Sequence, residues 1–176
     1  GRAAKRLDRI ANPRKIEADF IRQIITRDPS SSRTIMWQSE AAESAAAVEW
    51  REKDAQAVQR AAATNEDFTD DGRTAVLHAA ELEGMMPGRR YEYRLVSGEE
   101  ASEWRPLTTP AERDGFKALI FPDSQSSDYS VWRDVAQGAW QRNRDAGFFV
   151  NMGDLVDNGE DHTQWDAWLS AVVPMI

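Results

Sequence analysis

The 176-residue sequence contains no cysteine and only two histidines. The absence of cysteine excludes disulfide bonds and thiolate metal ligands, although it leaves the cellular compartment undecided. No apolar run approaches the roughly 20 residues that a membrane-spanning helix needs. The sequence therefore predicts a chain without a membrane span, whose hydrophobic residues, 41% of the total, suffice for a packed core.

Positive charge is scarce after the first fifteen residues. The chain has 22 Lys and Arg against 30 Asp and Glu, which gives a formal net charge of −8. Because nucleic-acid binding requires a basic surface, we expect no nucleic-acid-binding surface. Residues 1–15 are predicted to be a basic leader, either solvated or a fraying helix, with a phosphate- or membrane-binding arm as the alternative. Its basic residues are Arg2, Lys5, Arg6, Arg9, Arg14 and Lys15.

Residues 16–110 alternate short apolar segments with polar turns. Candidate strands are RTIMWQS (33–39), AAVEWREK (46–53), TAVLHAAEL (74–82) and RYEYRLVSG (90–98), followed by SEWRPLTTP (102–110) as a last strand. Tyr91, Tyr93 and Leu95 alternate with polar residues, as a half-buried strand requires. The acidic stretch ATNEDFTDDG (63–72) is expected to be a loop. Several short strands of this kind predict an all-β sandwich.

The segment ELEGMMPGRRYEYRL (81–95) carries a more specific pattern. Met85, Pro87 and Tyr91 take the places of the leucine-like residue, the proline and the tyrosine at the E–F corner of fibronectin type III-like domains. The segment therefore resembles a tyrosine corner, in which the tyrosine hydroxyl bonds back to the backbone. We expect a structural role for this tyrosine. His78, inside a predicted strand, is expected to be packed or half-exposed rather than a ligand.

The apolar pattern changes after residue 110, and residues 111–176 form a second predicted domain. FKALIF (116–121) and GFFVNMGD (147–154) are apolar runs typical of buried parallel strands. Helical spacing predicts a helix over 130–146 with Gly147 at its C-cap. A second helix should begin near residue 161, on the spacing of Trp165, Trp168, Leu169 and Val172. The order strand, helix, strand, helix predicts a βαβ unit, with the tryptophans in its core.

Acidic residues follow both strands of this unit. Asp123 lies in FPDSQ (121–125), and Asp154 lies in MGDLVDNG (152–159). Because open α/β sheets bind ligands at the carboxyl ends of their strands, we expect the two carboxylates close together at one edge. Adjacent anions repel unless a cation lies between them, and hard divalent cations prefer oxygen ligands. A metal site is one interpretation, and ordinary turn and helix-capping chemistry is the other.

The same residues carry a resemblance. GDLVDNG (153–159) is similar to the second signature of the calcineurin-like metallophosphoesterase superfamily, and PDSQ (122–125) resembles its first signature, D-x-H or, in purple acid phosphatases, D-x-G. A fibronectin-like sandwich directly before such a unit resembles purple acid phosphatases. The resemblance runs from about residue 16 to the end. It implies a β-sandwich followed by the first βαβα portion of an α/β metallophosphoesterase domain.

The resemblance implies a phosphoesterase that hydrolyses phosphate esters with two metal ions and a metal-bound hydroxide as nucleophile. Asp123 would bind one metal ion and Asp154 would bridge both. Gln125 stands where a histidine or glycine is usual, and its amide oxygen would be a further ligand. Iron, zinc and manganese are the candidate metals.

The remaining residues of the second signature are expected to support the ligands. Asp157 stands in the place of the iron-binding tyrosine of purple acid phosphatases, so we expect a colourless site. Asp157 itself is expected to support the ligands or shape the turn rather than bind metal. Asn158, Gly153 and Gly159 are expected to shape the same turn.

The sequence also departs from the superfamily. The later signatures, a GNH[DE] segment, a lone histidine and a GHxH segment, do not occur in it. Its second histidine, His162, is expected at the surface or in the cap region of a helix. No residue of the chain is therefore expected to be catalytic. We expect the sequence to be the N-terminal portion of a longer enzyme and to be inactive alone.

Two functions stay open. The first is the phosphoesterase, whose partner is a phosphate-ester substrate: a monoester, a nucleotide or a diester. The alternative is a non-catalytic fibronectin-like binding module with a vestigial α/β segment.

The short α/β piece should expose apolar surface at Phe148, Phe149 and the tryptophans, and should pack on the sandwich, on another copy or on a C-terminal remainder. The resemblance implies a secreted or periplasmic protein.

Overall fold

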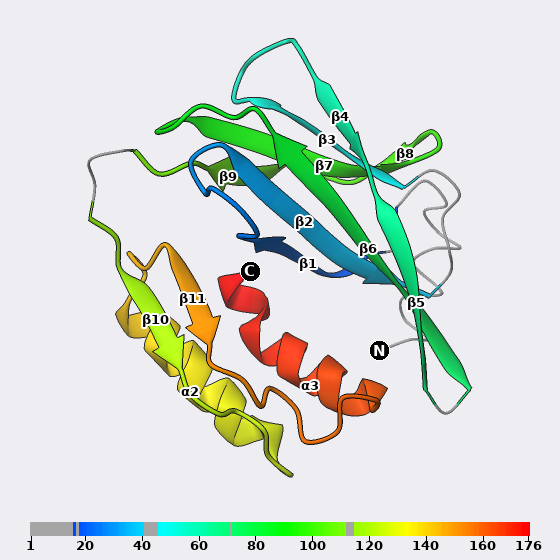
Figure 1. Ribbon diagram of the computed structural model, residues 1–176, viewed down its shortest axis with the longest axis vertical. Helices are drawn as coiled ribbons and strands as arrows, with labels where there is room; N and C mark the ends of the chain where they lie inside the picture. Colours follow the sequence, from blue (N-terminus) through cyan, green and yellow to red (C-terminus); the bar gives the residue numbers. More distant parts are fainter. Residues whose placement is uncertain (1–15, 17, 41–45, 71, 112–114) are drawn as a thin grey trace. The chain divides into compact units, whose positions relative to one another are not determined.

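The computed structural model describes residues 16, 18–40, 46–70, 72–111 and 115–176 (Figure 1). The predicted basic leader at 1–15 lies outside these residues. The described residues of Gly1–Phe68 and Thr74–Glu112 form one compact unit, and those of Thr69–Arg73 and Arg113–Ile176 form another.

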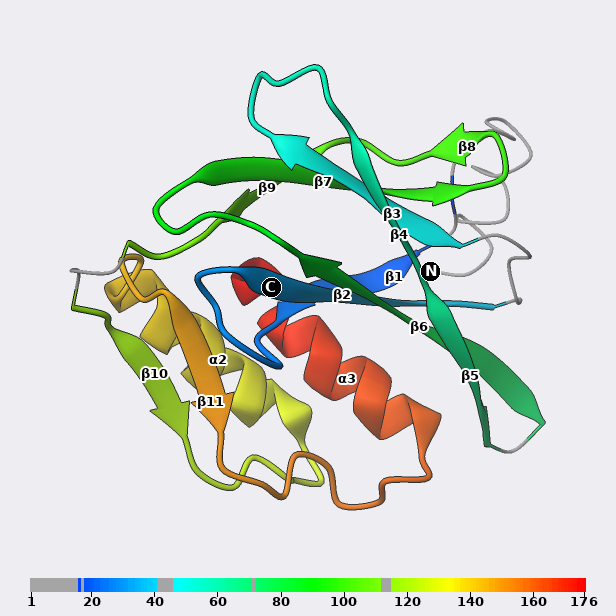
Figure 2. The same cartoon turned by 45° about the horizontal axis from the view of Figure 1, so that its top comes forward.

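The first unit consists of β-strands, although the ends of two of them, at 69–70 and at 73, belong to the second unit. The strands are β1 (Asp19–Ile24), β2 (Ser32–Ser39), β3 (Ala47–Glu52), β4 (Gln59–Ala62), β5 (Thr64–Asp70), β6 (Arg73–Glu83), β7 (Arg90–Ser97), β8 (Glu100–Ala101) and β9 (Arg105–Thr108). One sheet has the order β1-β2-β6-β5. The other has the order β4-β3-β7-β8, with β9 also pairing with β7. The prediction of an all-β sandwich is confirmed (Figures 1 and 2).

The core of the sandwich lies between the inward faces of the two sheets. Ile35 and Leu82 come from one sheet, and Val48 and Leu95 come from the other, all 1% exposed or less. Burying an aliphatic side chain of this size contributes about 1.5–3 kcal/mol relative to leaving it exposed. The predicted alternation of β7 is observed, because its buried apolar positions are separated by partly exposed ones.

The tyrosine corner is also confirmed. The backbone N–H of Met86 donates a 2.7 Å hydrogen bond to the hydroxyl oxygen of Tyr91, and the Met85 side chain is buried. The hydroxyl of Thr109 donates to the carbonyl oxygen of Met86 at 2.6 Å, which ties the same corner to the end of β9. Tyr91 therefore has a structural role.

The prediction of a loop at 63–72 is wrong over most of its length, because Thr64–Asp70 forms strand β5. Strand β4 pairs with β3 in one sheet, and β5 lies next to β6 in the other, so the chain passes from sheet to sheet at Ala63 (Figure 1). Most side chains of β5 are exposed. Its position at a sheet edge explains the missing apolar alternation, because backbone pairing rather than side-chain burial holds it in place.

The second unit contains β10 (Ala118–Phe121), α2 (Tyr129–Arg142), β11 (Phe148–Asn151), α3 (His162–Val172) and the 3₁₀ helix η1 (Val173–Met175). Strands β10 and β11 pair in parallel, from Ala118 opposite Phe148 to Phe121 opposite Asn151. The order of strands and helices is the predicted one. Asp161 is the N-cap residue of α3, as expected for a helix that begins near residue 161.

Aromatic side chains hold this unit together. Phe121 of β10 meets Trp132 of α2 edge to face at 5.1 Å, and Trp132 stacks on Trp168 of α3 at 5.4 Å. Helix α2 buries Trp132 and Ala136, whereas Val135 on a neighbouring stripe is 52% exposed. Parallel strands and both helices are thus joined through one aromatic cluster.

The predicted end of the first helix is wrong. Helix α2 ends at Arg142 and its C-cap residue is Asn143, not Gly147. The side-chain amide of Asn143 donates to the carbonyl oxygen of Ala139 at 2.9 Å, so it satisfies one of the free carbonyls at the helix end. Gly147 instead donates its N–H to the carbonyl oxygen of Lys117, next to the start of β10.

The opposite face of the two-stranded sheet is apolar and exposed. Ile120 and Val150 are register partners on this face and are 59% and 39% exposed. The expected exposure is wrong for Trp132 and Trp168, which are buried, whereas Phe148 and Phe149 are half-buried. Phe149 packs against Phe121 of the aromatic cluster, and Phe148 contacts Phe116, which is itself exposed. Within the part of the chain that the structure describes, no helix is long and apolar enough to cross a membrane.

Candidate functional site

The predicted ligand segments follow two neighbouring strands. Asp123 comes two residues after the end of β10, and Asp154 comes three residues after the end of β11. Because these strands are parallel, both loops leave the same edge of the sheet. The backbone N–H groups of Ser124 and Gln125 donate to the carbonyl oxygen of Asp154 at 3.1 and 2.7 Å. The structure therefore brings the two loops together.

The backbone of Asp154 has an uncommon conformation. Its φ is +44°, in the left-handed region, and the preceding Gly153 has a φ of +127°. Aspartate enters this region more readily than most residues, and glycine enters it freely. The two conformations turn the Asp154 carbonyl toward the first loop while its side chain stays exposed. Backbone strain of this kind is concentrated at functional sites.

The first loop presents its polar side chains in a short turn. The carboxylate of Asp123 accepts a 3.0 Å hydrogen bond from the N–H of Gln125. Both side chains are exposed. An aspartate side chain that accepts a hydrogen bond from the backbone N–H two residues later forms a common type of turn. Here this turn holds Asp123 beside the point where the two loops are hydrogen-bonded.

A buried serine lies between the two predicted ligands of the first loop. The hydroxyl oxygen of Ser124 accepts hydrogen bonds from the side-chain amide of Asn151 and from the indole N–H of Trp168, both at 2.9 Å. It also lies 3.4 Å from the carbonyl oxygen of Leu155, to which it donates. Ser124 is 8% exposed. The side chain of one residue thus contacts both loops and helix α3.

Side chains from the helices hold the later part of the second loop. The hydroxyl of Tyr129 accepts from the N–H of Asp157 at 3.3 Å and donates to the side-chain oxygen of Gln164 at 3.1 Å. The same oxygen of Gln164 accepts from the N–H of Asn158 at 2.9 Å. The backbone of this turn is therefore fixed from α2 and α3, whereas the Asp157 carboxylate is exposed.

The end of the turn leads directly into α3. The side chain of Asn158 accepts from the N–H of Glu160, and the carbonyl oxygen of Gly159 accepts from the indole of Trp165 at 2.9 Å. Gly159 has no positive φ, in contrast to Gly153. Hydrogen bonds from the Thr163 hydroxyl and backbone hold the pKa of the N-cap carboxyl of Asp161 below its usual value.

The two loops carry oxygen donors of the kind that a hard metal ion binds. Asp123 and Asp154 supply carboxylates and Gln125 supplies an amide oxygen, which suits a hard cation. Among the described residues, no group of three or more His, Asp or Glu is placed to hold a metal ion. Asp123, Asp154 and Gln125 could therefore supply some of the oxygen ligands of a cation. The described residues do not form a complete dinuclear centre.

The histidine His78 is fully buried in the sandwich. Its ring stacks on Trp37 at 4.9 Å, and its two nitrogens each lie 2.8 Å from a side-chain oxygen, one from the Ser39 hydroxyl and the other from the Asn65 amide oxygen. Burial lowers the pKa of His78 from its usual value of 6.5. These contacts agree with the packed structural histidine that the sequence predicts.

The histidine His162 is the first residue of α3, which confirms the predicted place in the cap region of a helix, although its side chain is buried and not at the surface. It is 3% exposed. Its backbone N–H donates to the Asp70 carboxylate at 3.1 Å, and its Nε2 lies 3.2 Å from the carbonyl oxygen of Arg73. Arg73, whose carbonyl oxygen contacts the ring, belongs to the same compact unit as α3. Contacts so distant in the sequence could not be anticipated from helix periodicity.

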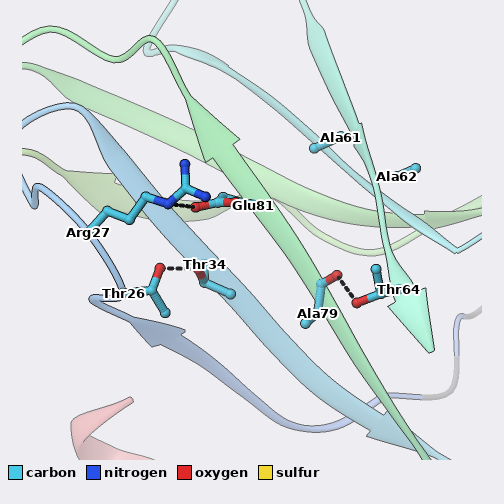
Figure 3. A pocket seen from close by; sticks show the side chains of 8 residues that line it. All are labelled: Thr26, Arg27, Thr34, Ala61, Ala62, Thr64, Ala79 and Glu81. Carbon is cyan, nitrogen blue, oxygen red and sulfur yellow. Dashed lines mark hydrogen bonds and ion pairs between the residues drawn. The ribbon is translucent and has the colours of Figure 1, made fainter. Parts of the chain in front are cut away.

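An open hollow of about 580 Å³ lies on the sandwich, between strands of both sheets (Figure 3). Its polar side chains are bonded within the sandwich. Thr26 pairs with Thr34, Arg27 pairs with Glu81, and Thr64 donates to a backbone carbonyl. The polar side chains of the hollow therefore already bind other groups of the sandwich, whereas the carboxylates of Asp123 and Asp154 at the strand ends are exposed.

Comparison with known families assigns the first unit. A family described as the purple acid phosphatase N-terminal domain matches residues 19–109, which is 91 of the 176 residues. The chain belongs to this family. The match confirms the resemblance to purple acid phosphatases over the sandwich, whose tyrosine corner and strand order are described above.

Other comparisons give distant likenesses. A chain from a study of the computer-based redesign of a β-sandwich protein is 17% identical, with 52% of this chain and 94% of that chain covered and a TM-score of 0.35. Astrotactin-2, described as a vertebrate-specific, perforin-like membrane protein of neuronal development, is 13% identical, with 73% of this chain and 26% of that chain covered and a TM-score of 0.40. No curated protein matches the sequence.

Several residues of the site were not singled out from the sequence. They are the residues that join or hold the loops: Ser124, Tyr129, Asn151, Gln164 and Trp168. The sequence contained a weak indication for Trp168, because the indole N–H of a buried tryptophan needs a hydrogen-bond partner. Nothing in the sequence identifies that partner as Ser124, which is 44 residues away.

Proposed function

We propose that the chain is part of a metal-dependent phosphoesterase of the purple acid phosphatase type, and that residues 111–176 begin its metal-binding domain. The observation that carries the proposal is the bonding of the Asp123 loop to the Asp154 loop through the Gln125 N–H. Two loops joined at the ends of parallel strands place acidic side chains at one edge of the sheet. The family match of the preceding sandwich supports a phosphatase.

Asp123 and Asp154 are proposed to bind cations through their carboxylates, with the Gln125 amide as an additional oxygen donor. A bound divalent cation supplies positive charge that polarises a phosphoryl group and lowers the pKa of bound water. Imidazole ligands are absent from the loops, because the two histidines of the chain are bonded elsewhere. The remaining ligands of a dinuclear centre would therefore come from residues other than those of this sequence.

The charge of the loops also favours a cation-dependent reaction. Asp123, Asp154 and Asp157 are exposed in the two loops, and Glu160 follows them. A phosphate ester would be repelled by these carboxylates without an intervening cation. The substrate class that follows is a phosphate ester bound through metal, rather than an anion bound directly by the protein.

A manganese titration of the purified 176-residue chain tests the proposal. We expect weak Mn²⁺ binding that is lost in Asp123→Asn and in Asp154→Asn. Asparagine keeps the shape of the side chain, and it also tolerates the left-handed backbone at position 154. The matched control is Glu160→Gln, which removes one exposed charge just after the same loop and should change the affinity by less than about threefold.

The outcomes separate the two functions left open by the sequence. Binding that depends on Asp123 and Asp154 supports the phosphoesterase. Equal losses in all three variants would show nonspecific attraction by negative charge and would contradict the site. No binding by the unmodified chain would favour an interaction module built on the sandwich. Turnover of a phosphate monoester or diester by the chain alone would refute the expected inactivity.

A further inference from the structure

We propose that Ser124 is a positioning residue, whose buried hydroxyl, held by Asn151 and Trp168, fixes the Asp123 and Asp154 carboxylates for the cation. The inference rests on the proposed function, because it concerns the same loops. It adds a residue that binds neither metal nor substrate.

The hydrogen-bonding capacity of the Ser124 hydroxyl is fully used. A hydroxyl accepts two hydrogen bonds and donates one. Here it accepts from Asn151 and Trp168 at 2.9 Å and donates to the Leu155 carbonyl oxygen at 3.4 Å. Each partner leads to a different part of the structure: the end of β11, helix α3 and the residue after Asp154. One oxygen atom of the first loop therefore contacts the second loop and both elements that flank it, β11 and α3.

The amide of Asn151 extends the connection to the residue before Asp154. Its nitrogen donates to Ser124, while its oxygen accepts from the N–H of Gly153 at 3.1 Å. Asp154 thus has a contact of this network on each side, at Gly153 and at Leu155. Asp123 directly precedes Ser124 in the chain. The network holds the backbone on both sides of one predicted ligand and beside the other.

The indole of Trp168 links the loops to the helix core. Trp168 and Trp132 are stacked, and each is 5% exposed or less. The Trp132 N–H points to the backbone carbonyl of Trp168 at 3.4 Å, whereas the Trp168 N–H reaches the Ser124 hydroxyl. The two rings share one packing role, and only Trp168 contacts the first loop.

Such a network has a direct consequence for metal affinity. The carboxylates are exposed on loops, so their positions depend on what holds the backbone. Residues that hold metal ligands through hydrogen bonds typically change metal affinity by about 10- to 100-fold when they are mutated. Loss of the Ser124 hydroxyl would also leave the buried N–H of Trp168 without its acceptor.

The test compares Mn²⁺ dissociation constants and urea unfolding midpoints of the full 176-residue chain and four variants. Ser124→Ala is matched with Ser126→Ala, a serine of the same loop that accepts only from the N–H of Asp128. Trp168→Phe is matched with Trp132→Phe, since each replaces one indole of the stacked pair by a smaller phenyl ring without an N–H. We expect Ser124→Ala and Trp168→Phe to weaken Mn²⁺ binding by about tenfold, with both controls within about twofold.

The pattern of results separates positioning from general destabilisation. The inference would be overturned if the Mn²⁺ affinity falls in proportion to the urea unfolding midpoint across all four variants. Equal Mn²⁺ affinities of Ser124→Ala and Ser126→Ala would also overturn it. If the unmodified chain binds no Mn²⁺, the proposed function fails, and amide hydrogen exchange at Gln125 tests the positioning alone. Faster exchange in Ser124→Ala than in Ser126→Ala supports it, and equal exchange overturns it.

Discussion

The N–H of Gln125 donates a 2.7 Å hydrogen bond to the carbonyl oxygen of Asp154. The same N–H lies 3.0 Å from the carboxylate of Asp123. One peptide group therefore contacts both acidic residues that follow the parallel strands. This relationship makes the two loops a single unit, and the predictions for the site depend on it.

Replacing Asp154 by glycine should separate the stability of the turn from its function. Glycine adopts the left-handed φ of +44° without strain. It also has more freedom in the unfolded chain, which opposes this gain. We expect the free energy of unfolding to stay within about 1 kcal/mol of the original chain, while Mn²⁺ binding is lost.

Asp54→Gly is the matched control, because Asp54 also has a left-handed φ, of +68°, in a turn of the sandwich. It should change stability by a similar small amount and leave Mn²⁺ binding unaltered. Urea unfolding and manganese titration measure the two quantities. Retained Mn²⁺ binding in Asp154→Gly would remove Asp154 from the proposed ligands.

The tyrosine corner provides a prediction for the sandwich. Tyr91→Phe removes the acceptor of the 2.7 Å bond from the Met86 N–H. Leaving a part-buried N–H without a partner should lower the free energy of unfolding by about 1–3 kcal/mol. Met86→Ala keeps this backbone bond and changes a side chain that is 61% exposed, so its effect should stay below about 0.5 kcal/mol. Equal unfolding midpoints for Tyr91→Phe and Met86→Ala would contradict the role of the hydroxyl.

His78 should make the stability of the chain depend on pH. Burial lowers the pKa of this imidazole, so its neutral form is favoured in the folded state. As the pH falls through the unfolded-state value of about 6.5, the unfolded chain binds a proton that the folded chain does not. The free energy of unfolding should therefore decrease toward the folded-state pKa, by up to about 1.4 kcal/mol per pH unit.

Urea unfolding at pH 7.5, 6.5 and 5.5 measures this dependence. His78→Gln, which keeps a neutral polar side chain in contact with Ser39 and Asn65, should show a smaller slope over this range. Most carboxylates titrate at lower pH, and His162 is present in both proteins. Parallel pH profiles for the two proteins would show that His78 does not carry the effect.

The ring of Trp104 should stabilise the sandwich through two arginines. The guanidinium carbons of Arg51 and Arg94 lie 4.4 and 4.7 Å from its centroid. Each cation–π contact of a partly exposed pair contributes about 0.5–1 kcal/mol. Trp104→Leu should therefore lower the free energy of unfolding by about 1–2 kcal/mol, and Trp104→Phe should lose less because it retains an aromatic face. A leucine variant as stable as the phenylalanine variant would show that apolar area alone matters.

Much of the secondary structure could be predicted because it depends on neighbours in the chain. The alternation of Tyr91, Tyr93 and Leu95 determined one buried face of β7. The spacing of Met85, Pro87 and Tyr91 predicted the tyrosine corner. The exposed edge strand β5 was missed because its side chains carry no apolar alternation and its place is set by pairing with β6.

The candidate site could be predicted only in part for a similar reason. The position of Asp123 and Asp154 after two apolar strands is a property of the sequence, and parallel pairing of those strands follows from the intervening helix. The Ser124 network joins residues 27 and 44 positions apart. Such bonds depend on how strands and helices pack, and on which buried donors then need an acceptor.

The sequence by itself determined that two apolar strands of the second unit are each followed by an acidic loop, because apolar runs and turn-forming residues are local patterns. The predicted second strand, 147–154, ends earlier in the structure, at Asn151. Only the tertiary structure decided that the Asp154 carbonyl turns to Gln125 and that Trp168 reaches Ser124. The physical reason is the distance along the chain. A hydrogen bond between segments brought together by folding leaves no periodicity in either segment.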